Sequence, residues 1–79
     1  MNAKLVFLGK LADLAGAAER EVAPGPLADV LAALPVQLAV ALLDERVRLA
    51  LNGELIAHPE GAVLQPGDEL AFLPPVSGG

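Results

Sequence analysis

The chemistry that this sequence offers is concentrated in its last six residues, Pro74-Pro75-Val76-Ser77-Gly78-Gly79. Neither proline can donate to a strand ladder, so the pair should end the preceding strand and start an extended arm. Six extended residues span roughly 20 Å, and the two glycines have no side chain to block passage through a narrow channel. The sequence therefore predicts that the carboxylate of Gly79 is the reactive group, presented at the tip of an arm.

Such a carboxylate would need activation, because it is a poor electrophile. Adenylation turns one oxygen into a good leaving group, and attack by sulfur then leaves a terminal thiocarboxylate. The chain has no cysteine, so it has no thiol of its own to carry sulfur or hold zinc. The alternative is an ordinary chain end, where glycine and serine are common. Because the tail directly follows a Gly67-Asp68-Glu69 turn and an apolar strand, we favour the functional interpretation.

Few other side chains suggest catalysis. His58 is the one histidine, and no further ligand stands at metal-binding spacing. We therefore expect no metal, and we interpret His58 as a loop residue beside Pro59. Asp68 and Glu69 could form an acid–base pair, but the preceding Gly67 indicates that they shape a turn and stay in solvent.

The charge balance limits the partners. The net charge is −5 and only Phe7 and Phe72 are aromatic, whereas a nucleic-acid binder needs a basic surface and stacking rings. We expect no nucleic-acid partner, and we expect a basic groove on a partner protein instead. Lys10, Arg46 and Arg48 could hold a partner or an acidic substrate, although ordinary surface positions are the simpler interpretation.

Length and hydropathy indicate one small domain. The chain has 79 residues, 54% of them hydrophobic, which suits one core and argues against disorder. The apolar run at residues 5–8 is too short for a secretory signal, and no run reaches the roughly 18 residues of a membrane span. We expect a cytoplasmic protein with no membrane contact, a domain at residues 1–73 and a tail at 74–79.

Two periodicities run along the domain, one typical of strands and one typical of helices. The predicted elements are a strand at 4–9, a helix at 11–16, an edge strand at 18–23, a helix at 27–34, a further helical segment at 36–43, and strands at 47–52, 54–57 and 69–73. Pro26 should begin the main helix and Pro35 should end or bend it. Asn52-Gly53 and Pro66-Gly67 predict tight turns.

The order of these elements predicts an α+β fold of the ubiquitin-like β-grasp type. The first two strands should form a hairpin-like unit joined by the short helix. A mixed sheet with one main helix packed across it would then bury the apolar faces. Several small folds share this order, so the order alone assigns no function.

Four segments of the chain together carry a resemblance to a known family: residues 4–9, 13–16, 51–55 and, above all, 67–79. In them the chain resembles the MoaD family, the small subunits of molybdopterin synthase. The resemblance covers the whole chain in order and length, and its specificity lies mainly in the tail. It implies a β-grasp fold and a sulfur carrier that holds its sulfur as a thiocarboxylate on Gly79.

The resemblance also implies the partners and the reaction. An adenylating enzyme related to ubiquitin activators (MoeB-like) would activate Gly79 with ATP and magnesium, and a sulfurtransferase would supply sulfur. The tail would then enter the large synthase subunit (MoaE-like) and give its sulfur to cyclic pyranopterin monophosphate, building the molybdopterin dithiolene. This chain would bind no cofactor and would be the non-catalytic, sulfur-donating subunit of a heterotetramer.

Apolar residues on the sheet near the tail form the docking surface of that family, and the matching positions here are Leu8, Leu55 and Leu73. Strand alternation supports the match, because Phe7 and Phe72 should face one side of the sheet while Leu8 and Leu73 face the other. The family often has an aromatic residue where Leu73 stands. The alternative is that the chain's own helices cover these leucines.

Three alternative functions remain open. The chain could carry sulfur for thiamine thiazole, cysteine or tRNA thiolation, since those carriers also end in Gly-Gly. It could be a protein modifier, in which an amine attacks the adenylated Gly79 and forms an isopeptide bond to lysine. It could also be an interaction domain with an inert tail. Pro-Pro-Val-Ser before the glycines favours the molybdopterin pathway.

Overall fold

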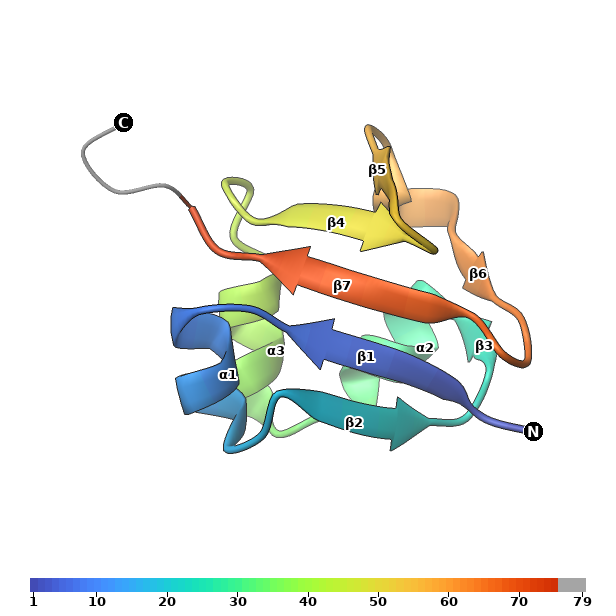
Figure 1. Ribbon diagram of the computed structural model, residues 1–79, viewed down its shortest axis with the longest axis horizontal. Coiled ribbons are helices and arrows are strands. Elements are labelled where there is room, and N and C mark those ends of the chain that lie inside the picture. Colours follow the sequence, from blue (N-terminus) through green and yellow to red (C-terminus); the bar gives the residue numbers. More distant parts are fainter. Residues whose placement is uncertain (76–79) are drawn as a thin grey trace.

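A five-stranded mixed sheet forms one layer of the protein, and short helices cover one of its faces (Figure 1). The computed structural model describes residues 1–75. In chain order the elements are β1 (Ala3–Phe7), α1 (Lys10–Ala15), β2 (Glu19–Val22), β3 (Gly25–Pro26), α2 (Leu27–Ala32), α3 (Val36–Leu42), β4 (Arg48–Leu51), β5 (Glu54–Ile56), the 3₁₀ helix η1 (Pro59–Gly61), β6 (Val63–Leu64) and β7 (Glu69–Leu73).

The first and last strands lie side by side in the middle of the sheet (Figure 1). The strand order is β2-β1-β7-β4-β5. The β1–β7 pair is parallel, and the β1–β2, β4–β7 and β4–β5 pairs are antiparallel. The predicted mixed sheet is confirmed, and β7 brings the start of the tail out of the centre of the sheet.

Alternate residues of the central strands point toward the helices and form the core. Leu5 and Leu70 are fully buried, and the rings of Phe7 and Phe72 stack with centroids 5.8 Å apart. The helices complete this core with the following buried leucines and valine: Leu11, Leu27, Val30, Leu31, Leu38 and Leu42. The prediction that both phenylalanines fill the core is confirmed, and strand alternation is the physical reason.

The helical layer follows the sequence signals closely. Gly16 ends α1 in the left-handed region at φ 79°, where it donates to the carbonyl of Ala12 at 2.9 Å. Pro35 stands in extended geometry (φ −53°, ψ 140°) between α2 and α3. The helical region is thus divided at Pro35, as the proline predicted, and the further helical segment predicted at residues 36–43 is confirmed by α3.

Both predicted tight turns are present. Asn52 and Gly53 have positive φ values of 51° and 87° and join β4 to β5 in a two-residue hairpin of the I′ kind. Gly67 has φ 88°, and the N–H of Asp68 donates to the carbonyl of Gln65 at 3.0 Å. That geometry is the type II turn that Pro66-Gly67 predicts.

The sequence did not predict the small sheet formed by β3 and β6, or the 3₁₀ helix between β5 and β6. Pro26 was expected to be the first residue of the main helix, but it belongs to β3 and α2 begins at Leu27. The N–H of Leu27 donates to the carbonyl of Ala62 at 2.9 Å. Two-residue strands carry no readable periodicity, so this pairing depends on contacts between distant segments.

Candidate functional site

The tail leaves the domain where the parallel strands β1 and β7 end. The N–H of Leu8 donates to the carbonyl of Phe72 at 3.2 Å, which extends the parallel ladder to the end of β7. Gly9 follows at φ 55°, and a Cβ built on it would lie 3.1 Å from Cγ of Pro74. A side chain at residue 9 would therefore be strained by the backbone and would also crowd the base of the tail.

Only part of the predicted tail belongs to the described structure. Pro74 and Pro75 are half-buried at the end of β7. The other predicted tail residues, Val76, Ser77, Gly78 and Gly79, lie outside the described residues. The site is therefore defined structurally by the surface around Pro74 and Pro75.

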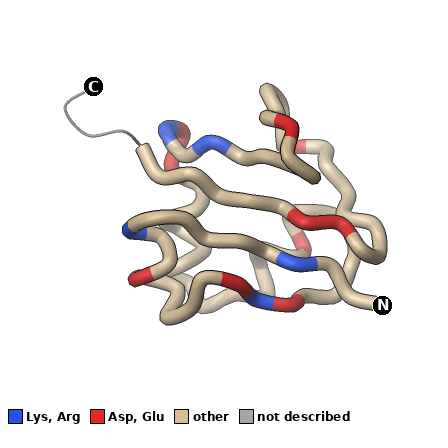
Figure 2. The backbone as a smooth tube through the Cα atoms, in the orientation of Figure 1, with Lys and Arg blue, Asp and Glu red and all other residues tan. Residues whose placement is uncertain are grey.

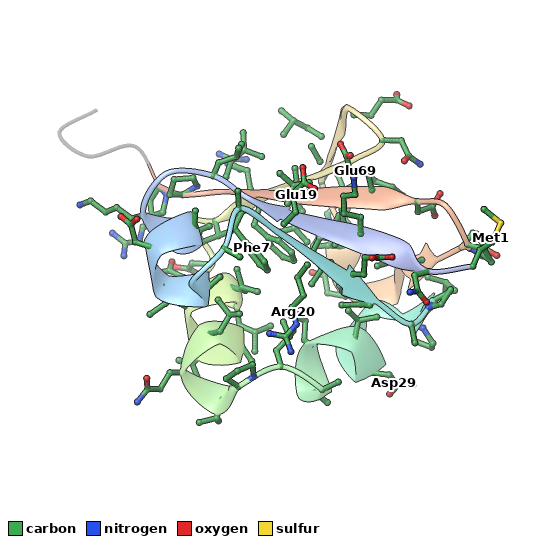
Figure 3. The ribbon with its side chains drawn as sticks, turned by 60° about the horizontal axis from the view of Figure 1, so that its bottom comes forward. Met1, Phe7, Glu19, Arg20, Asp29 and Glu69 are labelled. Atoms are coloured by element: carbon green, nitrogen blue, oxygen red, sulfur yellow. The ribbon has the colours of Figure 1, made fainter. Side chains whose placement is uncertain are left out.

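One face of the sheet carries no helix within residues 1–75, and we call it the outer face. Register places Val6, Ala71, Ala50 and Leu55 in one row across β1, β7, β4 and β5. The neighbouring row, closer to the tail, contains Leu8, Leu73 and Arg48, with Arg48 directly opposite Leu73. In Figure 3 the helices lie below the sheet, whereas Glu19 and Glu69 project from the opposite side.

The three predicted docking residues share this outer face. Leu8 is 42% exposed and Leu55 is 70% exposed, while Leu73 is half-buried beside the base of the tail. The alternative that the chain's own helices cover them is wrong for residues 1–75, because the helices pack on the other face (Figure 3). An apolar surface thus extends from β5 to the base of the tail. The role of these leucines in docking remains a prediction.

Charged residues lie at both ends of this apolar surface (Figure 2). At the end remote from the tail, Lys4 lies opposite Glu21 on β2 and Glu69 on β7. Lys4 pairs at 3.4 Å with Glu19, which lies opposite Val6 on the edge strand β2. At the tail end are the three cations that the sequence singled out: Lys10, Arg46 and Arg48. Arg46 and Arg48 line a hollow with Pro74 and Pro75. Lys10 directly follows Gly9, which lies against Pro74, so all three cations are near the base of the tail.

Asp44 and Arg46 are hydrogen-bonded to each other in the turn between α3 and β4. The guanidinium of Arg46 donates to Oδ1 of Asp44 at 3.2 Å and to Oδ2 at 2.9 Å, and the N–H of Arg46 donates to Oδ1 at 2.9 Å. These hydrogen bonds lower the pKa of Asp44 to about 2. A shallow hollow beside this turn is lined by Glu45, Arg46, Arg48, Pro74 and Pro75.

Asp68 has a structural role at the opposite end of the sheet. Its carboxylate accepts from the N–H of Gln65 at 2.8 Å and from Nδ2 of Asn52 at 3.0 Å, and both bonds lower its pKa. The N–H of Glu69 donates to Oδ1 of Asn52 at 3.0 Å. The prediction that Asp68 shapes a turn is confirmed. The link that Asn52 makes between the two turns could not be predicted from local pattern, because the residues involved are 16 and 17 positions apart.

No other described residues form an evident reaction centre. His58 is exposed and precedes η1. Within residues 1–75 there is no group of three or more His, Asp or Glu residues arranged to hold a metal ion. A cavity of about 400 Å³ lies between α2, β5 and η1, and its lining is mainly apolar. Among the described helices, none has the length and hydropathy needed to cross a membrane.

Comparison with known proteins gives a consistent picture. The model of the ThiS family matches residues 5–79. A molybdopterin synthase sulfur carrier subunit from Escherichia coli is 37% identical, over 96% of this chain and 98% of that protein. A protein of the same name from Chlamydomonas reinhardtii is 33% identical over the full length of both chains.

Solved structures agree with these sequence relatives. The crystal structure of SAMP1 from Haloferax volcanii matches with a TM-score of 0.75 and 28% identity over the whole of both chains. The solution structure of small archaeal modifier protein 1 from Methanosarcina acetivorans matches with a TM-score of 0.79 and 25% identity, over 99% of this chain and 96% of that one. The predicted ubiquitin-like β-grasp fold is confirmed.

Proposed function

The chain belongs to the ThiS family, and from that membership we propose that it is the sulfur carrier subunit of a molybdopterin synthase. The main support is the match over nearly the full length of two proteins with that name. The match includes the Gly-Gly tail that the sequence identified as the reactive segment. The predicted family resemblance is confirmed, and the reaction described below is our proposal.

The proposed chemistry takes place on the carboxylate of Gly79. One carboxylate oxygen attacks the α-phosphate of ATP, and pyrophosphate leaves with magnesium bound. Hydrosulfide from the sulfur source then attacks the acyl carbon, the bond from that carbon to the phosphate oxygen breaks, and AMP leaves with the oxygen. The product is a thiocarboxylate, in which one sulfur replaces one oxygen. The absence of cysteine supports this route, because the carrier has no thiol on which sulfur could rest.

The proposed partners are a large synthase subunit and a ubiquitin-activator-like adenylating enzyme. The outer face supports this proposal, because Leu8, Leu55 and Leu73 form an apolar surface that leads to the base of the tail. The tail would enter the large subunit and donate sulfur to cyclic pyranopterin monophosphate, with the catalytic side chains on that subunit. Two small subunits on a dimer of large ones would give a heterotetramer.

Intact mass spectrometry tests the carrier chemistry directly. The chain is incubated with its adenylating enzyme, ATP, magnesium and a sulfur source. Exchange of oxygen for sulfur should add about 16 mass units, localised to Gly79. A variant lacking Gly78 and Gly79 should gain none. If the full chain gains no mass from an enzyme shown to be competent on another carrier, the proposal is wrong.

A protein modifier is the second candidate, because the solved structures similar to this chain include small archaeal modifier protein 1. In that case a lysine amine attacks the adenylated Gly79 and forms an isopeptide bond. The last lysine or arginine is Arg48, so trypsin would leave a long remnant on the target. Cleavage after Glu69 leaves residues 70–79 on the target lysine, and this remnant can be sought in cell extracts.

The remaining candidate functions can be distinguished by the large protein that binds the chain and by whether the function requires the Gly-Gly tail. A carrier for thiamine thiazole, cysteine or tRNA thiolation would load sulfur in the same way but would co-purify with a different large partner. An interaction domain with an inert tail would keep its function after loss of Gly78 and Gly79. The large protein retained by the tagged chain therefore identifies the pathway, once loading has been demonstrated.

A further inference from the structure

Arg48 lies on the outer face next to the base of the tail. It begins β4 and lies directly opposite Leu73, the last residue of β7 before the prolines. Alternation along β4 buries Leu49 and places Arg48 on the same side as Ala50 and Leu73. Arg48 is exposed, and it lines a hollow together with Pro74 and Pro75, so it lies next to the base of the tail.

Arg48 also differs from the other arginine of this region. The charge of Arg46 is neutralised by Asp44, which accepts two hydrogen bonds from the guanidinium. Within residues 1–75, by contrast, no carboxylate lies within ion-pair distance of Arg48, although Glu45 lines the same hollow. A guanidinium has five donors in a planar fork that suits a carboxylate or a phosphate, and in the described structure those of Arg48 remain available.

The rest of the outer face is neutral or acidic. Lys4 is paired with Glu19, and Glu21 and Glu69 add negative charge at the end remote from the tail. Strand register thus places Glu21, Glu69 and the paired Lys4 at the end remote from the tail, and it places Arg48 at the tail end. A partner that covers this surface meets charges of opposite sign at its two ends, which can select one orientation.

We propose that Arg48 binds a carboxylate of the adenylating enzyme at the mouth of the channel that accepts the tail. The inference rests on the proposed function, since it requires an enzyme that activates Gly79. The ion pair orients the domain on the enzyme so that the tail points into the channel. Arg48 is a positioning residue and takes no part in the reaction.

Distance favours a protein carboxylate over the phosphates of ATP. Gly79 is the sixth residue after Leu73, and an extended segment of six residues spans roughly 20 Å. When the tail is threaded into the enzyme, Arg48 stays beside Leu73 at the channel mouth. The nucleotide reacts at the other end of the tail, out of reach of a side chain on β4. The binding role of Arg48 should therefore be independent of ATP.

The test compares three variants of the full chain with the wild type. Arg48→Glu reverses the charge, and Arg48→Lys keeps the charge but removes the fork. Arg20→Glu is the matched control, because Arg20 is also exposed but lies on the edge strand β2 and projects to the helix side (Figure 3). Association and dissociation rates with the adenylating enzyme are measured at low and high salt, with and without ATP.

We expect Arg48→Glu to weaken binding about tenfold at low salt, mainly through slower association, and to lose most of that effect at high salt. Arg48→Lys should associate at nearly the normal rate and dissociate faster, and Arg20→Glu should stay within about twofold of the wild type. Equal effects of Arg48→Glu and Arg20→Glu would overturn the proposal, as would an effect seen only with ATP.

The mass assay separates failure of this inference from failure of the proposed function. At saturating enzyme, Arg48→Glu should still gain the thiocarboxylate mass, because Arg48 does not touch the reacting atoms. If the wild type loads sulfur and Arg48→Glu binds normally, only the role of Arg48 is wrong. If the wild type itself gains no mass, the sulfur-carrier proposal is wrong.

Discussion

Phe72 and Leu73 are neighbours in β7, yet they face opposite sides of the sheet and have different surroundings. Phe72 is fully buried, stacks on Phe7 and lies on the face of the sheet that the helices cover. Leu73 is half-buried on the outer face, between Arg48 and the base of the tail. The same difference is found at the end of β1, where Phe7 is buried and the next residue, Leu8, is 42% exposed.

The comparison shows how a 79-residue chain can separate stability from recognition. Successive side chains of a strand point to opposite faces of the sheet, so one strand can contribute both to the core and to a binding surface. The helical layer covers only the face that contains the phenylalanines. The outer face keeps an apolar surface that makes no contribution to the core. Substitutions on the two faces should therefore have separable effects on unfolding and on binding.

The largest effect is expected from Phe72→Ala. Removing a buried aromatic side chain leaves a cavity and should lower the free energy of unfolding by about 3–5 kcal/mol. Leu73→Ala should lower it by roughly 1 kcal/mol or less, because that side chain is half-exposed. Urea unfolding followed by circular dichroism measures both values. Similar losses for the two variants would mean that the outer face also supports the fold.

The next effect concerns binding, and it is tested by Leu55→Asp. A carboxylate in the apolar surface should weaken binding to the large synthase subunit about tenfold or more, because it would be desolvated there. Stability should change by only about 0.5 kcal/mol, since Leu55 is 70% exposed. Calorimetric titration gives the affinity and thermal unfolding gives the stability.

Val40→Asp is the control for this prediction. Val40 is 65% exposed but belongs to α3 in the helical layer. The substitution introduces the same charge at a similar exposure on the covered side of the molecule. Normal binding by Leu55→Asp, or equal weakening of binding by the two variants, would mean that the outer face is not the docking surface.

Features set by neighbouring residues could be predicted from the sequence. Alternation identified Phe7 and Phe72 as core residues and placed Leu8 and Leu73 on the other face. Turn chemistry is equally local, because Asn52-Gly53 tolerates the positive φ values that a two-residue hairpin needs. These signals were sufficient for the fold class and for the apolar part of the candidate site.

Features set by distant residues could not be predicted in the same way. The β3–β6 pair joins segments nearly forty positions apart and is two residues long, so no periodicity marks it. Arg48 lies beside the tail only because β4 pairs with β7. Asn52 reaches Asp68 for a related reason, since both turns meet at the same end of the sheet. Such contacts follow from strand pairing rather than from local pattern.

The hairpin turn keeps Leu55 on the outer face, and Gly53→Ala tests it. Gly53 has φ 87°, and a Cβ there would meet no atom within 4 Å, so backbone strain alone should cost about 1 kcal/mol. Gly61→Ala is the control, because Gly61 also has open space but lacks a positive φ. Gly61→Ala should leave the stability unchanged or raise it slightly. Equal urea midpoints for the two variants would show that the strain is relieved by rearrangement of the hairpin.

The smallest effect concerns Asp44, whose turn leads the chain from the helical layer into β4. Its hydrogen bonds to Arg46 lower its pKa from 3.8 to about 2 in the folded state. A group with a lowered folded-state pKa stabilises the fold above its unfolded value and loses that contribution as pH falls through the folded value. The stability difference between wild type and Asp44→Asn should be constant above about pH 5 and should shrink between about pH 4 and 2.

Urea unfolding at a series of pH values measures this difference. The amide introduced by Asp44→Asn would keep one oxygen to accept from the backbone N–H of Arg46. It would remove the charge and the second oxygen that accepts from the guanidinium, so the variant reports the whole side-chain contact with Arg46. Asp68 also has a lowered pKa, so it too loses its stabilising contribution in acid. This loss is the same in the wild type and in Asp44→Asn, so it cancels in the stability difference between them. A difference that stays constant down to pH 2 would mean that the Arg46 contact does not stabilise the folded state. The turn would then be held by the buried Val47 and the core on the covered face rather than by charge.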